Sequence, residues 1–190
     1  MITFAIYFLL LQKMQIKIHD KYFVPFISAQ EIDLAISKMA NQIMADFPDE
    51  IPVFVGVLNG AFMVVSDFMK HYKNPCEVCF IKTSSYEGMT STNEVKHLIG
   101  INQDLTGRTV IVIEDIVDTG NTIFELTESF ASYNIKELRF ATLFFKPEAY
   151  KKDIKIDYIG IKIPNKFIVG FGLDYDDLGR NLPEVYQLAE

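Results

Sequence analysis

Three acidic residues interrupt or follow a strongly apolar segment, VIVIEDIVDTGNT, at residues 110–122. Glu114 and Asp115 are adjacent, and Asp118 opens the short polar turn DTGNT. The apolar run predicts a strand buried on both faces. Carboxylates at its end could accept hydrogen bonds from hydroxyl groups, hold a metal ion or take up a proton.

The turn that follows has the composition of an anion-binding site. Thr119 and Thr122 offer hydroxyl groups, Gly120 lets backbone amides approach a ligand, and the next helix directs its N-terminus at the turn. Such a turn suits a phosphate, whereas Glu114 and Asp115 repel one. Both features fit a phosphorylated ribose, whose vicinal hydroxyls can donate to two carboxylates. A solvated acidic strand end before a capped helix explains the same residues equally well.

Other motifs with these residue types do not fit. The P-loop string G-x-x-x-x-G-K-[ST] does not occur. An EF-hand loop beginning at Asp115 would put the apolar Val117 and Leu126 at ligand positions. GFGLDY at 170–175 lacks the third glycine of a dinucleotide-binding fingerprint. The DTG of aspartic proteases belongs to all-β proteins, but here a helix is predicted to follow.

Composition limits the class of protein. A chain of 190 residues with 49% apolar residues suits one α/β domain with a sizeable core. The net charge of −7 argues against nucleic-acid binding, which usually needs a basic face. Cys76 and Cys79 are too few for a disulfide framework. In a strand they point to opposite faces, so we interpret them as two buried small apolar side chains.

The first residues form an apolar stretch, MITFAIYFLLLQ, that is shorter than the roughly 20 residues of a membrane span. It also lacks the basic start and small-residue cleavage site of a signal peptide. We therefore expect residues 1–13 to be a start-site extension, residues 14–190 to be a single domain, and the protein to be cytoplasmic with no membrane partner.

Strands and helices alternate through the middle of the chain. SAQEIDLAISKMANQIMADFP predicts a helix that begins with an S-x-x-E capping box and stops at Pro48. Further helices are expected at 62–72 and 121–133, and strands at 51–58, 76–82, 109–115, 137–145, 157–163 and, less clearly, 167–171. This order predicts an α/β fold with a mostly parallel sheet flanked by helices. Ligands bind at the carboxyl ends of such strands, where the 58–61 and 114–122 stretches fall.

The motif IEDIVDTGNT closely resembles the phosphoribosyl-diphosphate-binding motif of type I phosphoribosyltransferases. VGVLNGAF, KTSSYEG, LFFKP, IPNKFIVGFGLDY and the position of Arg180 resemble the hypoxanthine (-guanine) enzymes of that family, from about Met14 to the C-terminus. The resemblance implies a type I fold with a small hood and a mobile lid loop. It also implies magnesium-dependent transfer of 5-phosphoribosyl from 5-phosphoribosyl 1-diphosphate to a 6-oxopurine, in a homodimer or homotetramer.

The resemblance assigns roles within the acidic stretch. Glu114 and Asp115 would bind the ribose hydroxyls, in agreement with the diol argument, and are candidate metal ligands. Asp118 would be the general base that takes the proton from nitrogen 7 of the purine; capping of the next helix is its ordinary alternative. The other substrate-binding residues of this stretch would be Ile116, Val117, Thr119, Gly120, Asn121 and Thr122.

Two further elements would contact the base. Lys146 would bind the 6-oxo group of the purine, which favours an oxo acceptor over the amino donor of adenine. Phe167 would stack on the base, with the backbone of Lys166 and Ile168 along the base edge. Without the resemblance, Lys146 would be an exposed lysine at a strand end and Phe167 a core aromatic.

The remaining implied residues concern diphosphate and metal. Asp174 would carry Mg²⁺, with water ligands, and Arg180 would meet the diphosphate. Without the resemblance, Asp174 belongs to a solvated acidic turn and Arg180 to the surface. The diphosphate loop would comprise Leu58, Asn59 and Gly60, with a cis Leu58–Asn59 bond. Here the sequence departs from the family, because Asn59 and Asn121 stand where many or some members carry a basic residue.

The polar segment 83–107 would supply the lid, with Ser85 and Tyr86 matching the Ser-Tyr pair of the family. Its closure would exclude water while the anomeric carbon develops positive charge. Two other interpretations remain: a phosphoribosyl-diphosphate-binding regulator, or a type I enzyme for another base. Neither a helix-turn-helix pattern nor a basic run supports a regulator, and Lys146 with KFIVG favours a 6-oxopurine.

Overall fold

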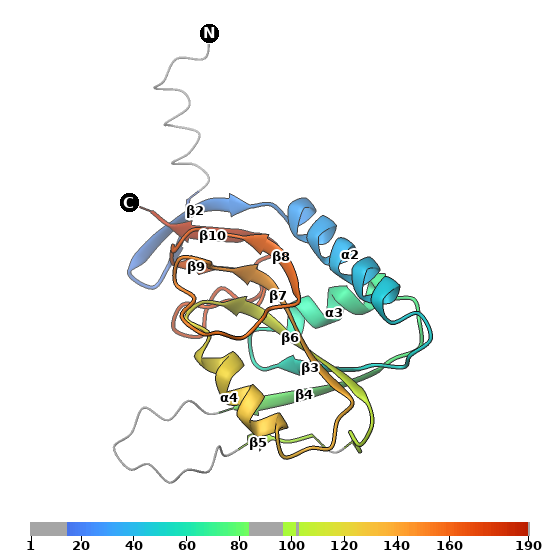
Figure 1. Ribbon diagram of the computed structural model, residues 1–190. Coiled ribbons are helices and arrows are strands. Elements are labelled where there is room, and N and C mark those ends of the chain that lie inside the picture. Colours follow the sequence, from blue (N-terminus) through green and yellow to red (C-terminus); the bar gives the residue numbers. More distant parts are fainter. Residues whose placement is uncertain (1–14, 84–96, 102, 190) are drawn as a thin grey trace, which may run out of the picture.

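The computed structural model describes residues 15–83, 97–101 and 103–189 (Figure 1). The expected start-site extension at 1–13 lies outside the described residues, as do Ser85, Tyr86 and most of the expected lid. The elements are β1 (Ile16–Ile18), β2 (Lys21–Ile27), α2 (Ala29–Asp46), β3 (Val53–Val57), α3 (Phe62–His71), β4 (Glu77–Thr83), β5 (His97–Ile99), β6 (Thr109–Val117), α4 (Asn121–Phe130), β7 (Glu137–Phe145), β8 (Tyr158–Lys162), β9 (Ile168–Val169) and β10 (Val185–Leu188).

The larger sheet has the order β5-β4-β3-β6-β7-β8. The five neighbouring strands β4, β3, β6, β7 and β8 run parallel to one another. β5 pairs antiparallel with β4 at one edge. Helices connect β3 to β4 and β6 to β7, as parallel strands require. The predicted α/β fold with a mostly parallel sheet is therefore confirmed.

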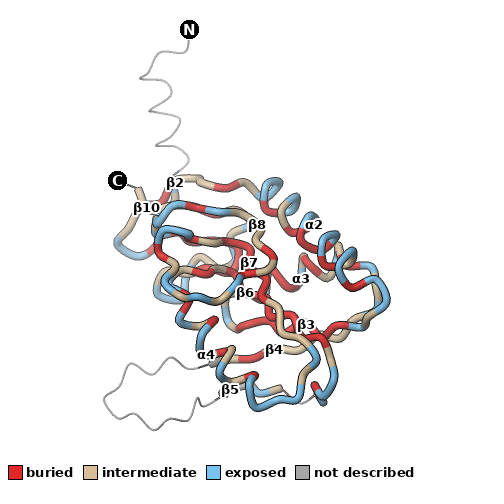
Figure 2. Tube along the Cα trace, viewed as in Figure 1, coloured by how far each residue is buried: buried red, intermediate tan, exposed pale blue. Residues whose placement is uncertain are grey.

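Helices cover both faces of this sheet, α2 and α3 on one face and α4 on the other (Figure 1). The side chains of each central strand alternate between the two faces. Phe54 and Ile111 pack with α2 and α3, whereas Val55 and Val112 pack with α4. Burial is accordingly continuous along β3, and along β6 it is interrupted only at the partly buried Ile116 (Figure 2). This accounts for the uninterrupted apolar runs in the sequence.

Helix α2 begins at the predicted capping box. The Glu31 amide donates to Ser28 Oγ at 3.3 Å, and the Ser28 amide donates to Glu31 Oε2 at 2.9 Å. Its apolar face is buried, and the helix ends at Asp46, two residues before Pro48. Capping and periodicity alone were sufficient to predict this element.

A smaller antiparallel sheet, which we call the hood, has the order β1-β2-β10-β9. β1 and β2 form a hairpin, and β10, from the end of the chain, pairs with β2 and β9. The hood has its own small core around Phe23 and Val169. The sequence signals predicted none of β1, β2 or β10, and the 167–171 strand shortens to the two residues of β9.

Two other features bear on the sequence predictions. Cys76 and Cys79 are free thiols that pack against the core but are only partly buried, so the prediction of two buried side chains holds in part. Burial still raises the pKa of the Cys79 thiol to about 11. Among the described residues, no helix combines the length and apolar character needed to cross a membrane.

Candidate active site

The 58–61 turn and the acidic strand end meet at the carboxyl edge of the sheet. A Cβ placed on Gly60 would lie 1.6 Å from Asp115 Oδ2, so the Gly60 backbone rests directly against that carboxylate. Only glycine permits so close an approach. The Leu58–Asn59 bond is cis, as predicted. Leu58 also donates its amide to the Ile81 carbonyl at 2.8 Å, which fixes the turn to β4.

Glu114 and Asp115 are buried, with exposed fractions of 5% and 8%. They are therefore not a solvated acidic strand end. Burial, and then the Asp115 charge, raise the pKa of Glu114 well above its ordinary value. Burial also raises the pKa of Asp115 to about 6, although the Ile116 amide donates to Asp115 Oδ1 at 2.8 Å and Arg180 opposes the shift. Two buried acceptors side by side suit a ligand that presents hydroxyl donors.

The DTGNT turn leads directly into α4. Gly120 is the residue before the helix and has φ +86°, a left-handed conformation that glycine adopts without strain. No side chain caps this helix, so the capping alternative for Asp118 was wrong. The first amides of α4 lack intrahelical partners and face the turn, as an anion site requires.

Lys146 and Asp118 form an ion pair, with Lys146 Nζ 2.7 Å from Asp118 Oδ2. The Lys146 side chain is buried, whereas the Asp118 side chain is 43% exposed. Lys146 also donates its amide to the Val117 carbonyl at 3.0 Å. Its interpretation as an exposed strand-end lysine was therefore wrong. Lys146 and Asp118, which are predicted to contact the neighbouring 6-oxo and nitrogen 7 atoms of the purine, thus lie together.

The structure places Phe167 in the segment that joins the large sheet to the hood. Its side chain is exposed to 45%, so it is not a core aromatic. Its carbonyl accepts from the Leu188 amide at 3.0 Å, which ties it to β10. Ile168 is buried in β9, and Lys166 precedes Phe167 with its amide 2.7 Å from the Pro164 carbonyl. A half-exposed ring in this position can stack on a planar base.

Asp174 and Arg180 are joined to each other and, through Gly172, to the 58–61 turn. Arg180 Nη2 lies 2.6 Å from Asp174 Oδ1, and Arg180 Nη1 donates to the Gly172 carbonyl at 2.7 Å. Asp174 Oδ2 accepts from the Asp177 amide at 2.9 Å. A Cβ on Gly172 would lie 2.1 Å from the Gly60 carbonyl oxygen. The 170–180 segment is thus in contact with the turn that holds Gly60.

The carboxylates of this edge are the hard oxygen donors that Mg²⁺ prefers. Among the described residues, however, no three His, Cys, Asp or Glu side chains converge as a metal cage. Mg²⁺ commonly keeps several waters and binds one or two carboxylates together with substrate phosphates. The donor set therefore fits a cation that carboxylates such as Asp174 would hold together with the phosphates of a ligand.

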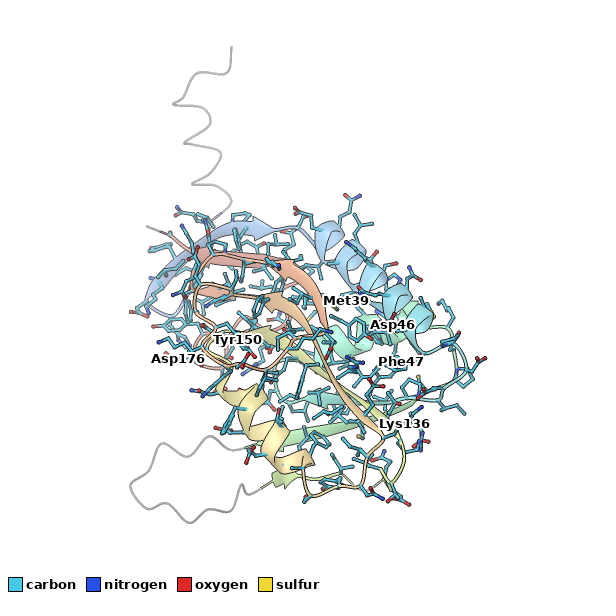
Figure 3. All side chains as sticks on the ribbon, in the orientation of Figure 1. Met39, Asp46, Phe47, Lys136, Tyr150 and Asp176 are labelled. Atoms are coloured by element: carbon cyan, nitrogen blue, oxygen red, sulfur yellow. The ribbon has the colours of Figure 1, made fainter. Side chains whose placement is uncertain are left out.

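Sequence reasoning missed several supporting residues. A Cβ on Gly120 would lie 2.4 Å from Tyr150 Cε2, so the Tyr150 ring packs directly against the 118–122 turn. Tyr150 and Asp176 lie on the same side of the molecule, away from Asp46 and Lys136 (Figure 3). Gly170 and Gly172 have positive φ angles, which explains why glycine occupies both positions of the GFG string. That string was a visible signal in the sequence.

Comparisons with known proteins agree with this geometry. The family model described as a phosphoribosyl transferase domain matches residues 27–176. A hypoxanthine-guanine phosphoribosyltransferase of Streptococcus mutans is 43% identical over 164 residues, covering 86% of this chain and 91% of that protein. A Bacillus anthracis hypoxanthine-guanine phosphoribosyltransferase structure matches with TM-score 0.81 and 39% identity, over 87% of this chain and 98% of the other. A Staphylococcus aureus hypoxanthine phosphoribosyltransferase structure matches with TM-score 0.82 and 32% identity, over 95% of both chains.

The chain belongs to the phosphoribosyltransferase family, and its fold is that of the type I enzymes. Within that family it groups with the hypoxanthine-guanine phosphoribosyltransferases, pentosyltransferase enzymes of purine salvage.

Proposed function

We propose that this enzyme transfers the 5-phosphoribosyl group from 5-phosphoribosyl 1-diphosphate to hypoxanthine and guanine, giving IMP or GMP and diphosphate. The observation that carries the proposal is the position of the Lys146–Asp118 pair beside the buried acids Glu114 and Asp115. The Lys146–Asp118 pair suits the edge of a 6-oxopurine, and the Glu114–Asp115 pair suits the hydroxyls of a ribose.

The base side of the reaction follows from the ion pair. Lys146 donates to the 6-oxo oxygen of the purine, and Asp118 accepts the proton from nitrogen 7. Nitrogen 9 forms the new bond to the anomeric carbon, whose bond to the diphosphate oxygen breaks with both electrons leaving on diphosphate. Lys146 holds the Asp118 carboxylate in place before the base arrives, and Phe167 orients the purine plane.

The sugar side follows from the acids and the turn. Glu114 and Asp115 accept from the ribose hydroxyls, while the amides of residues 119–122 and the N-terminus of α4 hold the 5-phosphate. Fixing the sugar at both ends leaves its anomeric carbon as the part that moves between diphosphate and base. The Asn59 and Asn121 side chains offer hydrogen bonds but no charge here.

We propose Mg²⁺ as the cofactor, held by Asp174 and the acid pair together with the diphosphate. Bound there, the cation would offset the negative charge of the leaving diphosphate. Arg180, freed from Asp174, would meet the diphosphate with its planar guanidinium. We further propose that the enzyme is a homodimer or homotetramer, and light scattering of the purified protein would measure this oligomeric state. We also propose that the enzyme is located in the cytoplasm.

A transfer assay tests the proposed reaction. The enzyme is incubated with 5-phosphoribosyl 1-diphosphate and either hypoxanthine, guanine, xanthine or adenine, with Mg²⁺ or with EDTA. We expect IMP and GMP, no product from adenine, and loss of turnover in EDTA. No nucleotide from any base, despite tight binding of 5-phosphoribosyl 1-diphosphate, would contradict transferase activity and favour a binding regulator.

A further inference from the structure

The β1–β2 hairpin of the hood reaches across to the ring proposed to stack on the base. The hairpin turn contains His19 and Asp20, and Lys21 begins β2. Lys21 Nζ lies 5.8 Å from the centroid of the Phe167 ring and 4.4 Å from that of Tyr175. A single ammonium group near the N-terminal end of the chain therefore contacts two aromatic rings of the 167–175 segment, within the range of cation–π attraction.

The two rings form an edge-to-face aromatic pair, with centroids 5.8 Å apart and planes inclined by 86°. Phe23, fully buried in β2, touches both of them, at 6.2 Å from Phe167 and 6.1 Å from Tyr175. Tyr175 is held further by its hydroxyl, which donates to Asp20 Oδ1 at 2.8 Å. The His19 ring packs edge-on against Tyr175 at 5.6 Å. Four residues of the hairpin thus fix the aromatic pair.

This arrangement restricts the rotation of the half-exposed Phe167 ring. A half-exposed aromatic side chain is free to rotate unless neighbours restrict it, and a rotating ring loses entropy when a base stacks on it. Tyr175 also directly follows Asp174, the proposed magnesium ligand. The hairpin therefore connects the proposed base-stacking ring with the segment that carries the metal ligand.

We propose that Lys21 is a positioning residue for the purine base, which holds the Phe167–Tyr175 pair in the orientation that stacks on the base. This inference rests on the proposed function, because it assumes that a purine binds against Phe167. Lys21 acts through the two rings and has no direct part in the chemistry. Removing its charge should weaken binding of ligands that carry a base, and leave ligands without a base unaffected.

The chain offers a matched control on the same hairpin. Lys17 Nζ lies 5.5 Å from the centroid of the Tyr22 ring, and both of these residues are exposed on the hairpin. Lys17→Met and Lys21→Met remove the same charge and the same kind of interaction. Only the second change affects the pair that contains Phe167.

The test compares two ligands by isothermal titration calorimetry: IMP, which carries the base, and 5-phosphoribosyl 1-diphosphate with Mg²⁺, which does not. We expect Lys21→Met to weaken IMP binding about fivefold, in line with the strength of a cation–π contact, and to change 5-phosphoribosyl 1-diphosphate binding less than twofold. Lys21→Arg should restore IMP binding, and Lys17→Met should match the wild type. In turnover assays, KM for hypoxanthine should rise while kcat stays within twofold.

The outcomes separate the inference from the proposed function. Wild-type protein that binds no IMP would overturn the proposed function. Wild-type protein that binds IMP, with Lys21→Met binding it equally well, would overturn only the role of Lys21. An equal loss for both ligands would show that Lys21 merely supports the hood. Lys21→Gln is a second variant for all measurements should Lys21→Met fold poorly, as judged by circular dichroism.

Discussion

At the scale of single residues, the proposed chemistry depends on which side chain accepts a proton. Asp118 is well placed because its carboxylate is partly open to solvent and also held by Lys146 at 2.7 Å. Asparagine in its place keeps the shape and a contact with Lys146 but cannot take up a proton. We expect Asp118→Asn to lower kcat by about 10²–10⁴-fold, the usual contribution of a general base. Steady-state kinetics with hypoxanthine measures the effect.

The control for Asp118→Asn is ligand binding. Affinity for 5-phosphoribosyl 1-diphosphate with Mg²⁺, measured by calorimetry, should change little, since the turn amides remain. Turnover at saturating substrates equal to that of the wild type would refute the assignment of Asp118 as the base.

Gly60 is the residue at which the smallest change should have the largest consequence. A methyl group there would occupy the position of Asp115 Oδ2, so either the carboxylate or the 58–61 turn must move. We expect Gly60→Ala to lower kcat/KM for 5-phosphoribosyl 1-diphosphate by at least about 100-fold, because both groups lie in the proposed substrate site.

Circular dichroism and thermal melting are the control for Gly60→Ala. The loss of kcat/KM counts as an effect on the site only if the variant folds and melts like the wild type. Full activity of the Gly60→Ala enzyme would mean that the close contact with Asp115 has no functional role.

At the scale of elements, the turn that follows β7 supports the 118–122 turn that follows β6, the proposed phosphate turn. The Tyr150 ring packs beneath Gly120, its hydroxyl donates to the Ile154 carbonyl at 2.5 Å, and the Lys151 amide donates to the Thr119 carbonyl at 3.2 Å. The amides proposed to hold the 5-phosphate are thus fixed by an element that begins at Lys146. Lys146 is also the residue proposed to contact the base.

We expect Tyr150→Ala to weaken binding of IMP about tenfold, because the turn loses the ring that keeps its amides in place. Inosine, which lacks the phosphate, should bind with unchanged affinity. Tyr150→Phe keeps the ring and should resemble the wild type. Calorimetry with both ligands is the measurement, and equal losses for IMP and inosine would contradict a role specific to the phosphate turn.

The elements also show which parts of the fold could be predicted from the sequence. The capping box of α2 and the apolar runs of β3 and β6 are local signals, and the structure agrees with them. The hood strands carry little such signal: β1 has three residues, β2 contains Pro25, and of the strand expected at 167–171 only the two residues of β9 form. They are stabilised by pairing between the two ends of the chain, which no local pattern records.

In the candidate site, too, local patterns were predictable from the sequence and contacts between distant residues were not. The spacing of Glu114, Asp115 and Asp118 along one strand end was readable in the sequence, and the family resemblance then supplied roles for distant residues. Burial of Lys146 against Asp118 was not readable, because a lysine before a proline gives no sign of its depth. The contact of Lys21 with Phe167 joins residues far apart in sequence and required the three-dimensional structure.

At the scale of the whole molecule, the buried acids should make the ligand-free protein less stable as pH rises. Asp115 has a pKa of about 6 in the folded state, against an ordinary value of 3.8, so between these values the folded chain binds more protons than the unfolded chain. Stability from this group is therefore fully present below about pH 4 and lost as pH rises through 6. The raised pKa of Glu114 acts in the same direction.

Asparagine at position 115 removes the charge that burial opposes, so Asp115→Asn should stabilise the ligand-free protein at neutral pH. The difference between pKa values of 3.8 and about 6 corresponds to about 3 kcal/mol, and a chain of this size gains about 2–4 °C in Tm for each kcal/mol. We expect the Tm of the variant to exceed that of the wild type by several degrees at pH 7.5 and to match it near pH 4.

Calorimetric melting across this pH range measures the difference in Tm. Glu128→Gln, on the exposed face of α4, is a control that should show no such pH dependence. A constant difference in Tm between variant and wild type at every pH would contradict the proton linkage. Such stabilisation, together with lost transfer activity, would show that the site holds these carboxylates at a cost to the fold because the substrate needs them.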